Sequence, residues 1–456
     1  MARDPYVLDA SLVEDPPTTW SGRLRMLGPG FILTATVVGS GELIATTTLG
    51  AKVGFVALWV ILLSCVVKVA LQLEFGRHTI LSGETCLAAF NRLPGPAWRG
   101  ANWTTWYWLA VQPLKMLQLG GIIGSVAMVL NIAAPALSVG AWCWITALVS
   151  ALLVSNEAYR PVERTCLAML AAFTATTIVS VASLQWTSYA VTGGELAEGF
   201  GGTIPAGAIL LLIGAFGLTG VGGDEIMQYT YWLIEKGYAA KTGPANPGDP
   251  VWTARARGWI RVMYLDAFAS MIVYTIVTAA FYLLGAAVLH ARGETPKGYA
   301  MINTMAGMYT ESLGPWARGV FLAGAFVVLF STVYSALAAW MRVFADAAGK
   351  LQLIDFYDLA ARRKTMLGIA WAFPLVWATI FLSYEEPVLM VALGGVGTAT
   401  ILFIIVVAAI HFRYRQTPPE LKPGPLYDAA LWVSIASIAT IAVYGIVKAL
   451  GEIPAS

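Results

Sequence analysis

Long apolar runs constrain this sequence more than any other feature. Eleven such runs recur along the 456 residues, most of them near the length of about 20 residues that an α-helix needs to cross roughly 30 Å of hydrocarbon. Charged residues make up only 12% of the chain, whereas a soluble domain carries about 25%. Because so little charge is left to cover a water-facing surface, the sequence predicts a polytopic membrane protein.

The spans must be helices, because backbone polar groups in lipid have to be satisfied within their own segment. The sequence therefore predicts an all-α polytopic membrane protein. The segment between the second and third spans, residues 77–102, is predicted to be amphipathic and to lie at the surface. The predicted spans are 27–49, 54–75, 103–133, 139–155, 162–184, 205–236, 259–288, 317–345, 366–383, 387–412 and 427–450.

Lys and Arg residues are concentrated before the first span and after each even-numbered span. The alternate segment 185–205 has none, whereas 289–316, with Arg292 and Lys297, departs from the pattern. Cytoplasmic loops carry the excess of positive charge. We therefore expect a cell (inner) membrane protein with a cytoplasmic segment 1–26 and an external carboxyl terminus. Residues 1–20 are polar and acidic and lack the pattern of a cleaved signal peptide, so the first span should be retained.

Composition excludes several kinds of partner. The net charge of +2 is too small to indicate binding to nucleic acid. Four cysteines show no CxxC spacing, and three histidines lie near span ends. We therefore expect no permanently bound cofactor, and the lipid bilayer as the main surrounding partner.

Two similar six-residue segments place acidic residues in the middle of apolar spans. They are Val-Gly-Ser-Gly-Glu-Leu at 38–43 and Val-Gly-Gly-Asp-Glu-Ile at 221–226. Five spans separate them, so the second copy is inverted in the membrane. Paired glycine-interrupted segments at matching positions indicate a transporter site between inverted repeats.

Glycines at these positions allow a helix to unwind and to turn backbone carbonyls toward a cavity. Together with nearby carboxylates, those carbonyls would form an all-oxygen site, which suits Mg²⁺, Ca²⁺ or Mn²⁺. One of the carboxylates could also carry a proton during the cycle. The candidate binding residues are Gly39, Gly41, Glu42, Gly222, Asp224 and Glu225, and the candidate proton pathway is Glu42, Asp266 and Gln118.

A second interpretation of these residues stays open. The glycines would only permit close helix packing, and the acids would pair with Lys68 and Lys115 inside spans two and three. Asp224 and Glu225 are adjacent, so they point about 100° apart on a helix. Asp266 and Gln118 equally suit helix pairing and structural hydrogen bonding.

Several short stretches in the first two thirds of the chain follow a recognisable order: Leu27-Gly28-Pro29-Gly30, 58–64, Gly124-Ser125, Tyr159-Arg160, Glu163 and Asp266. This order resembles the NRAMP family of proton-coupled divalent-metal transporters over about residues 27–350. The resemblance implies a LeuT-like fold of two inverted five-helix repeats, 27–184 and 205–412, plus an eleventh helix at 427–450.

The sequence departs from this family at its metal-binding motifs. The family's Asp-Pro-Gly-Asn falls on 39–42, so Gly39 replaces the ligand Asp and Glu42 replaces the ligand Asn. Its Met-Pro-His falls on 224–226, whereas a shift of three would put Met227 at the methionine position. Its acidic pair in span three falls on Gln118 and Gly121. Loss of the soft sulfur and gain of carboxylates argue against selective capture of Mn²⁺ or Fe²⁺ and favour a harder cation such as Mg²⁺.

The leading interpretation is a secondary-active transporter that moves a divalent metal cation by alternating access, with protons as a candidate coupling ion. The alternative is a symporter for a small organic amine or amino acid on the same fold. A sensor that no longer transports is a further alternative. The sequence contains no paired His-Asp, HExxH or nucleotide-binding loop, so we expect no enzyme. The coupling ion, the direction of flux and the oligomeric state are open at this stage.

Overall fold

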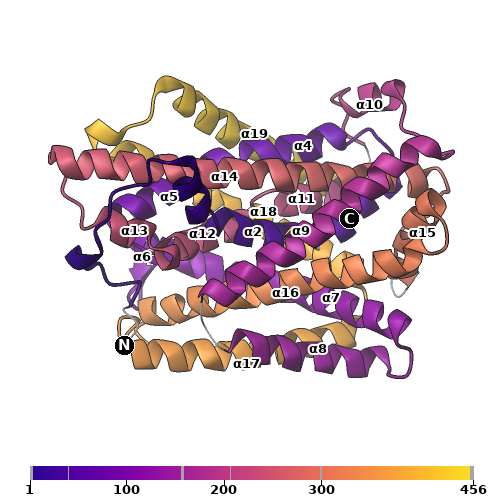
Figure 1. Ribbon diagram of the computed structural model, residues 1–456, viewed down its shortest axis with the longest axis horizontal. Coiled ribbons are helices and arrows are strands. Elements are labelled where there is room, and N and C mark those ends of the chain that lie inside the picture. The colour runs from indigo at the N-terminus through magenta and orange to yellow at the C-terminus, as the bar shows by residue number, and fades with distance from the viewer. Residues whose placement is uncertain (1–3, 40, 156–158, 206, 298–299, 452–456) are drawn as a thin grey trace.

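The computed structural model describes residues 4–39, 41–155, 159–205, 207–297 and 300–451. Its long helices run side by side along one direction of the molecule (Figure 1). In the described residues the one sheet is a pair of two-residue antiparallel strands, β1 (Ala97–Trp98) and β2 (Ala101–Asn102). The prediction of an all-α protein is confirmed.

Ten helices in the described residues are long and apolar enough to cross a membrane, and α8 is a shorter apolar helix of 16 residues. Together they match the eleven predicted spans. In chain order they are α2 (Pro29–Val37) with η2 (Gly41–Thr46) and α3 (Thr47–Val53), α4 (Leu58–Val67) with α5 (Val69–Ser82), α7 (Trp103–Ala133), α8 (Val139–Val154), α9 (Tyr159–Ser183) with η3 (Leu184–Trp186), α11 (Ile209–Leu218) with α12 (Gly223–Lys236), α14 (Pro250–Leu284) with η4 (Gly285–His290), α16 (Ala317–Lys350), α17 (Leu359–Tyr384), α18 (Pro387–His411) with η6 (Phe412–Gln416), and α19 (Pro425–Gly451).

Short helices connect these spans. The longest of them, α15, lies between spans seven and eight, where the sequence placed a loop. These elements are η1 (Ala10–Leu12), α1 (Trp20–Met26), α6 (Cys86–Phe90), α10 (Gly193–Gly199), α13 (Tyr238–Thr242), α15 (Met301–Leu313) and η7 (Pro419–Leu421).

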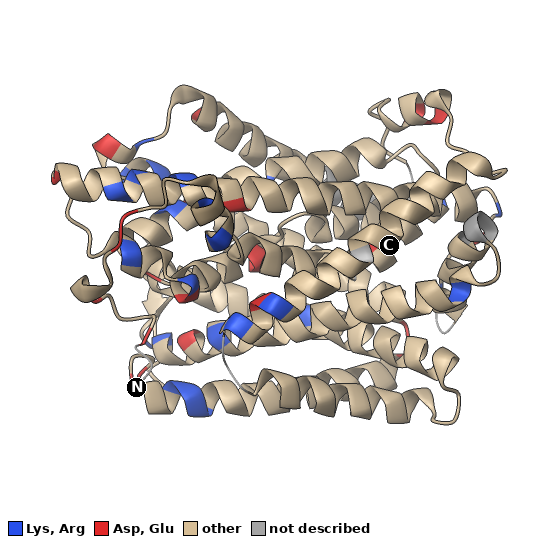
Figure 2. Ribbon diagram, viewed as in Figure 1, with Lys and Arg blue, Asp and Glu red and all other residues tan. Residues whose placement is uncertain are grey.

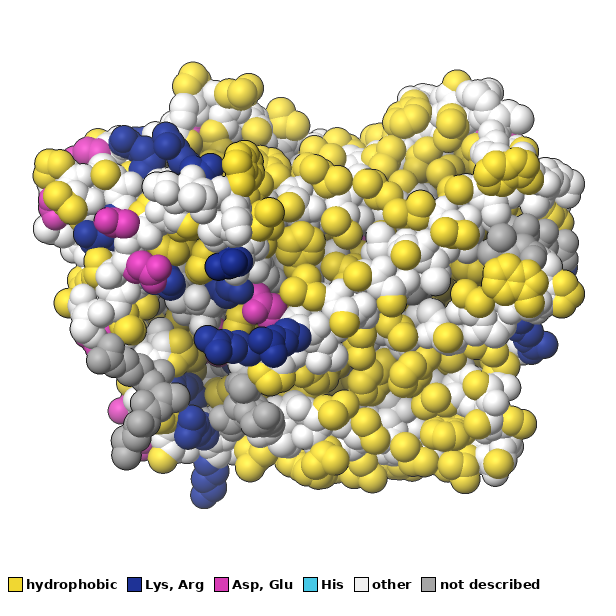
Figure 3. All heavy atoms as spheres, in the orientation of Figure 1, with side chains coloured by type: hydrophobic (Ala, Val, Ile, Leu, Met, Phe, Trp, Pro, Cys, Tyr) yellow, Lys and Arg dark blue, Asp and Glu magenta, His cyan; other side chains and the backbone are white. Residues whose placement is uncertain are grey.

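The outer surface of the helices is apolar, as a lipid environment requires. Hydrophobic side chains cover much of the face in Figure 3, and Lys and Arg gather toward its left end. On α8, for example, Leu148 and Leu152 are exposed. A water-soluble protein would not expose so large an apolar area.

Residues 77–90 depart from the predicted surface segment. Helix α5 continues to Ser82, and four of the five residues of α6 are buried. Arg77 lies inside the protein because its guanidinium group forms an ion pair with Glu74, one turn earlier in α5. A hydrophobicity pattern counts Arg77 as a surface residue because it cannot detect this partner.

Spans one and six are broken, as predicted. Helix α2 ends at Val37 and the chain resumes as the π-helix η2 at Gly41; Ser40 lies outside the described residues. Helix α11 ends at Leu218, and α12 starts at Gly223 after the non-helical residues 219–222. Within it, Gly220 has a φ of +61° and a Cβ there would lie 2.8 Å from Cys65 Cα, so glycine is required.

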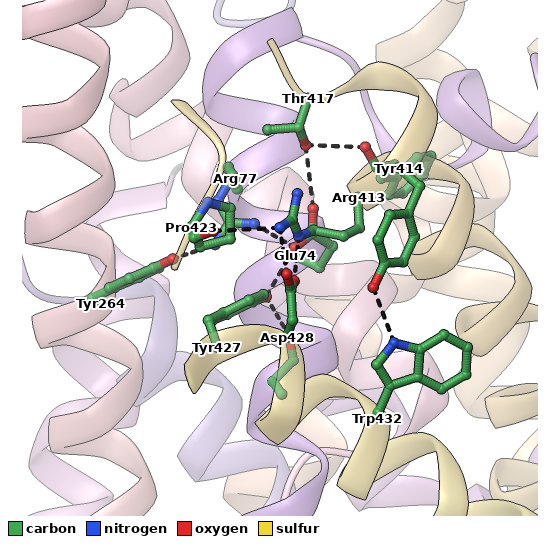
Figure 4. Close-up of polar contacts among 12 residues, drawn as sticks. Glu74, Arg77, Tyr264, Arg413, Tyr414, Thr417, Pro423, Tyr427, Asp428 and Trp432 are labelled. Atoms are coloured by element: carbon green, nitrogen blue, oxygen red, sulfur yellow. Dashed lines mark hydrogen bonds and ion pairs between the residues drawn. The ribbon is translucent and has the colours of Figure 1, made fainter. Parts of the chain in front are cut away.

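The eleventh helix is attached through buried polar groups as well as apolar packing (Figure 4). The Tyr427 hydroxyl on α19 donates to Glu74 Oε2 on α5 at 2.9 Å, and the Arg77 guanidinium lies over the Tyr427 ring at 4.5 Å. Nearby, Arg413 of η6 forms an ion pair with Asp428 of α19 at 2.6 Å. These contacts fix the start of α19 against α5 and η6.

Candidate substrate site at the two broken helices

The break in span one contains a fully buried acidic side chain. The two carboxylate oxygens of Glu42 accept hydrogen bonds from the Thr278 hydroxyl on α14, at 2.8 Å, and from the Gly39 amide, at 3.3 Å. Gly39 itself has no room for a side chain, because a Cβ there would lie 1.6 Å from Thr332 Oγ1 on α16. Glu42 therefore stabilises the unwound turn with uncharged donors.

The break in span six places Asp224 beside a lysine from span three. The Asp224 carboxylate lies 3.2 Å from Lys115 Nζ, and its other oxygen accepts from Trp108 Nε1 at 3.0 Å. The same ammonium group donates to Gln118 Oε1 at 2.6 Å and to Thr398 Oγ1 at 2.5 Å. Asp224 therefore forms the pairing with Lys115 that the second interpretation of the sequence described.

Glu225 has one carboxylate oxygen that, in the described residues, has neither a hydrogen bond nor the ion pair that Asp224 forms. Its side chain is 8% exposed, and Oε2 makes no hydrogen bond in the described residues. This oxygen lies close to Gly222, where an added Cβ would be 2.4 Å from it and 3.0 Å from the Gly217 carbonyl oxygen. A buried carboxylate oxygen without a partner is costly, so it is a natural ligand for an incoming cation.

The two breaks lie against each other. A Cβ at Gly41 would lie 3.3 Å from the carbonyl oxygen of Leu218, the last residue of α11. Nevertheless, in the described residues no three Asp, Glu, His or Cys side chains come close enough to hold a metal ion together. Glu42, Asp224 and Glu225 surround the breaks, but they do not form the single carboxylate cage expected from the sequence.

The remaining predicted site residues have other surroundings. Asp266 accepts hydrogen bonds from the amides of Gly28 and Gly30, at 2.8 and 2.7 Å, and therefore caps the start of α2. Gln118 is a partner of Lys115, and Met227 lies buried in the hydrophobic core one turn into α12.

Sequence reasoning missed Thr278, Thr398 and Trp108, which bind the charged groups at the breaks. Each is an ordinary residue for a membrane helix, and no local motif marks it. The sequence analysis also did not predict the interruption of span two, where Lys68 separates α4 from α5. The only signal was a lysine in the middle of an apolar run.

Comparison with known proteins decides the family. Residues 30–448 match the natural resistance-associated macrophage protein-like family, Nramp. The chain belongs to the Nramp family. This Nramp protein is 23% identical over 436 residues to a divalent metal cation transporter MntH of Brucella suis, covering 92% of this chain and 86% of the relative. It is 24% identical over 341 residues to uncharacterized protein PM0681 of Pasteurella multocida, covering 71% of each.

Solved structures show the same fold in this Nramp protein. A variant of the Eremococcus coleocola manganese transporter superposes with a TM-score of 0.69 at 15% identity, covering 99% of this chain and 94% of the other. MhsT in complex with L-phenylalanine superposes with a TM-score of 0.55 at 12% identity, covering 95% and 100%. The predicted LeuT-like fold is confirmed, as is the prediction that the protein is not an enzyme, because Nramp proteins are transporters.

Proposed function

We propose that this Nramp protein is a secondary-active transporter that moves a divalent metal cation by alternating access at the two broken helices. The observation that carries the proposal is the free oxygen of Glu225 beside the break in span six. Membership of a family whose relatives include divalent metal cation transporters supports it.

The ligands at the breaks are oxygen atoms, which favours a hard cation. Mg²⁺ usually keeps several of its waters and needs only one or two protein carboxylates. One free carboxylate, Glu225, and the carbonyls around Gly222 therefore suit Mg²⁺, and Mn²⁺ next. Selection of a softer metal would call for sulfur or imidazole ligands, and no group of three His, Cys, Asp or Glu side chains in the described residues supplies cysteine or histidine for one.

The test is uptake of Mg²⁺, Mn²⁺ and Ca²⁺ into proteoliposomes containing the full chain. Glu225→Gln should abolish metal uptake, because the amide offers the cation a much weaker ligand. Glu198→Gln, an exposed position on α10, is the matched control and should transport normally. Absence of uptake of all three metals by the wild type would refute the metal proposal.

A second candidate is a symporter for a small organic amine or amino acid. The charge balance at span six favours it, because Asp224 is already paired with Lys115, whereas Glu225 keeps an oxygen without a partner. One carboxylate matches one ammonium group. Uptake of an organic amine that metals do not inhibit, and that Glu225→Gln removes, would support this candidate.

We also propose that protons drive the cycle through Glu42, which is bound only by uncharged donors and can hold or release a proton without breaking an ion pair. An inward proton gradient should stimulate wild-type uptake. Glu42→Gln should transport without this stimulation, and unchanged stimulation would exclude Glu42 as the carrier.

For the orientation, we propose a cytoplasmic amino terminus and an external carboxyl terminus. Basic residues gather toward the left end of the molecule in Figure 2, which supports a cytoplasmic location for that end. Repeats 27–184 and 205–412 would be the two halves that alternate access. Labelling of single cysteines introduced at Lys241 and Glu198 in intact cells tests the orientation, because only the second should react.

A further inference from the structure

Lys68 is a buried charged residue to which the transport proposal gives no role. It lies at the interruption between α4 and α5, and its side chain is fully buried. Its ammonium group donates to the carbonyl oxygens of Phe216, at 2.7 Å, and Thr219, at 2.5 Å. It also lies 5.1 Å from the centre of the Phe216 ring.

The surroundings of this ammonium group are those of a cation site. The ion pairs in the described residues do not include Lys68, so backbone oxygens rather than a carboxylate replace its water. The Ser64 hydroxyl lies 2.8 and 3.1 Å from the same two carbonyl oxygens. An isolated buried ammonium group costs several kcal/mol, so these contacts must compensate closely.

The position of these carbonyls gives the site its charge. Phe216 and Thr219 lie at the end of α11, where unpaired carbonyl oxygens carry the negative end of the helix dipole. In transporters with broken helices, such half-helix ends and unwound carbonyls coordinate Na⁺ or a proton. Here the two carbonyl oxygens accept hydrogen bonds from a lysine of span two.

We propose that the ammonium group of Lys68 is a tethered monovalent cation that occupies the carbonyl site at the end of α11. It takes the place of a diffusible ion such as Na⁺, so the wild type needs no monovalent cation at this position. The proposal does not rest on the divalent-cation proposal, because it concerns a different group of ligands and needs no transported substrate for its test.

Removal of the tethered charge provides the test. Lys68→Ala leaves the two carbonyls and the Ser64 hydroxyl around a space that a small ammonium ion can enter. Purified full-length protein is heated in choline, sodium or methylammonium chloride at equal ionic strength. We expect the unfolding temperature of Lys68→Ala to rise with methylammonium and saturate, with a smaller rise in sodium and none in choline, which has no N–H donor.

Wild type and Lys52→Ala are the controls, and neither should distinguish the three salts. Lys52 is exposed, and its ammonium group also donates to a backbone carbonyl, that of Gly207, at 2.9 Å. Equal unfolding temperatures of each control in the three salts would show that the salt response of Lys68→Ala depends on the buried site. A simple helix cap does not predict this response.

An unfolding temperature of Lys68→Ala that is the same in all three salts would overturn the proposal, whether the protein is destabilised or not. If Lys68→Ala does not fold, Lys68→Met, which keeps most of the stem, is purified with and without methylammonium. Folding that requires methylammonium would support the proposal. Folding equally well without it, or failure to fold in either case, would overturn it.

Discussion

The buried ion pair between Lys115 and Asp224 joins span three to the start of α12, and its contribution can be measured. Lys115 would lose one of three partners in Asp224→Asn and would retain Gln118 and Thr398. In Lys115→Met, the Asp224 carboxylate would keep only the hydrogen bond from Trp108. Each single substitution therefore leaves a buried charge poorly compensated.

The distance sets the size of the expected effect. Two unit charges 3.2 Å apart attract each other by about 5 kcal/mol at an effective dielectric constant of about 20. Removing one partner of a buried pair typically costs about 3–5 kcal/mol. Removing both charges together also removes the uncompensated charge, so Lys115→Met/Asp224→Asn should cost much less than the sum of the single substitutions.

The assay is a double-mutant cycle on the free energy of unfolding, measured by denaturation in mixed micelles. We expect a coupling energy of about 2–3 kcal/mol. Lys52→Met is the matched control, because it removes the same ammonium group from an exposed position, and it should change the free energy by less than about 0.5 kcal/mol. Additive single-mutant effects, within about 0.5 kcal/mol, would refute the conclusion that the pair acts as a unit.

Two further predictions concern the ends of α2. Asp266→Asn should lower the free energy of unfolding by about 1.5–3 kcal/mol, because the side-chain amide cannot accept both backbone hydrogen bonds at the start of the helix; equal stability of variant and wild type in micelle denaturation would contradict it. Gly39→Ala should cost about 1–3 kcal/mol through overlap with Thr332 Oγ1, and Thr332→Ala in the same chain should recover part of that loss. Failure of the second substitution to recover any stability in the same assay would show that another contact is responsible.

The positions of the transmembrane helices could be predicted because they depend on the length of each apolar run along the chain, not on contacts between distant residues. Hydrocarbon thickness fixes the length of an apolar run, so the sequence located every span, including the breaks at 38–43 and 221–226. The prediction was wrong at 77–90, where burial of Arg77 depends on its neighbour Glu74 and on Tyr264 of α14. Partners of this kind do not appear in a hydropathy pattern.

The position of the candidate site could be predicted from the sequence, but the contacts of its residues could not. Glycines and acids in the middle of spans identified the two breaks, because such residues are costly in lipid. The sequence did not determine which helix faces each acid. Asp224 pairs with Lys115, which is 109 residues earlier in the chain, whereas Glu225 has a free oxygen; the two are neighbours in sequence with different surroundings.

Helix α8 is short for a membrane. Its 16 residues extend about 24 Å, compared with roughly 30 Å of hydrocarbon, and they present exposed leucines to the lipid. A helix shorter than the hydrocarbon cannot compensate by tilting; it is accommodated by local thinning of the bilayer, by flanking side chains that reach the interface, or by association with other helices. Because mismatch has a free-energy cost, we expect the stability of this face to depend on the acyl-chain length of the surrounding lipids.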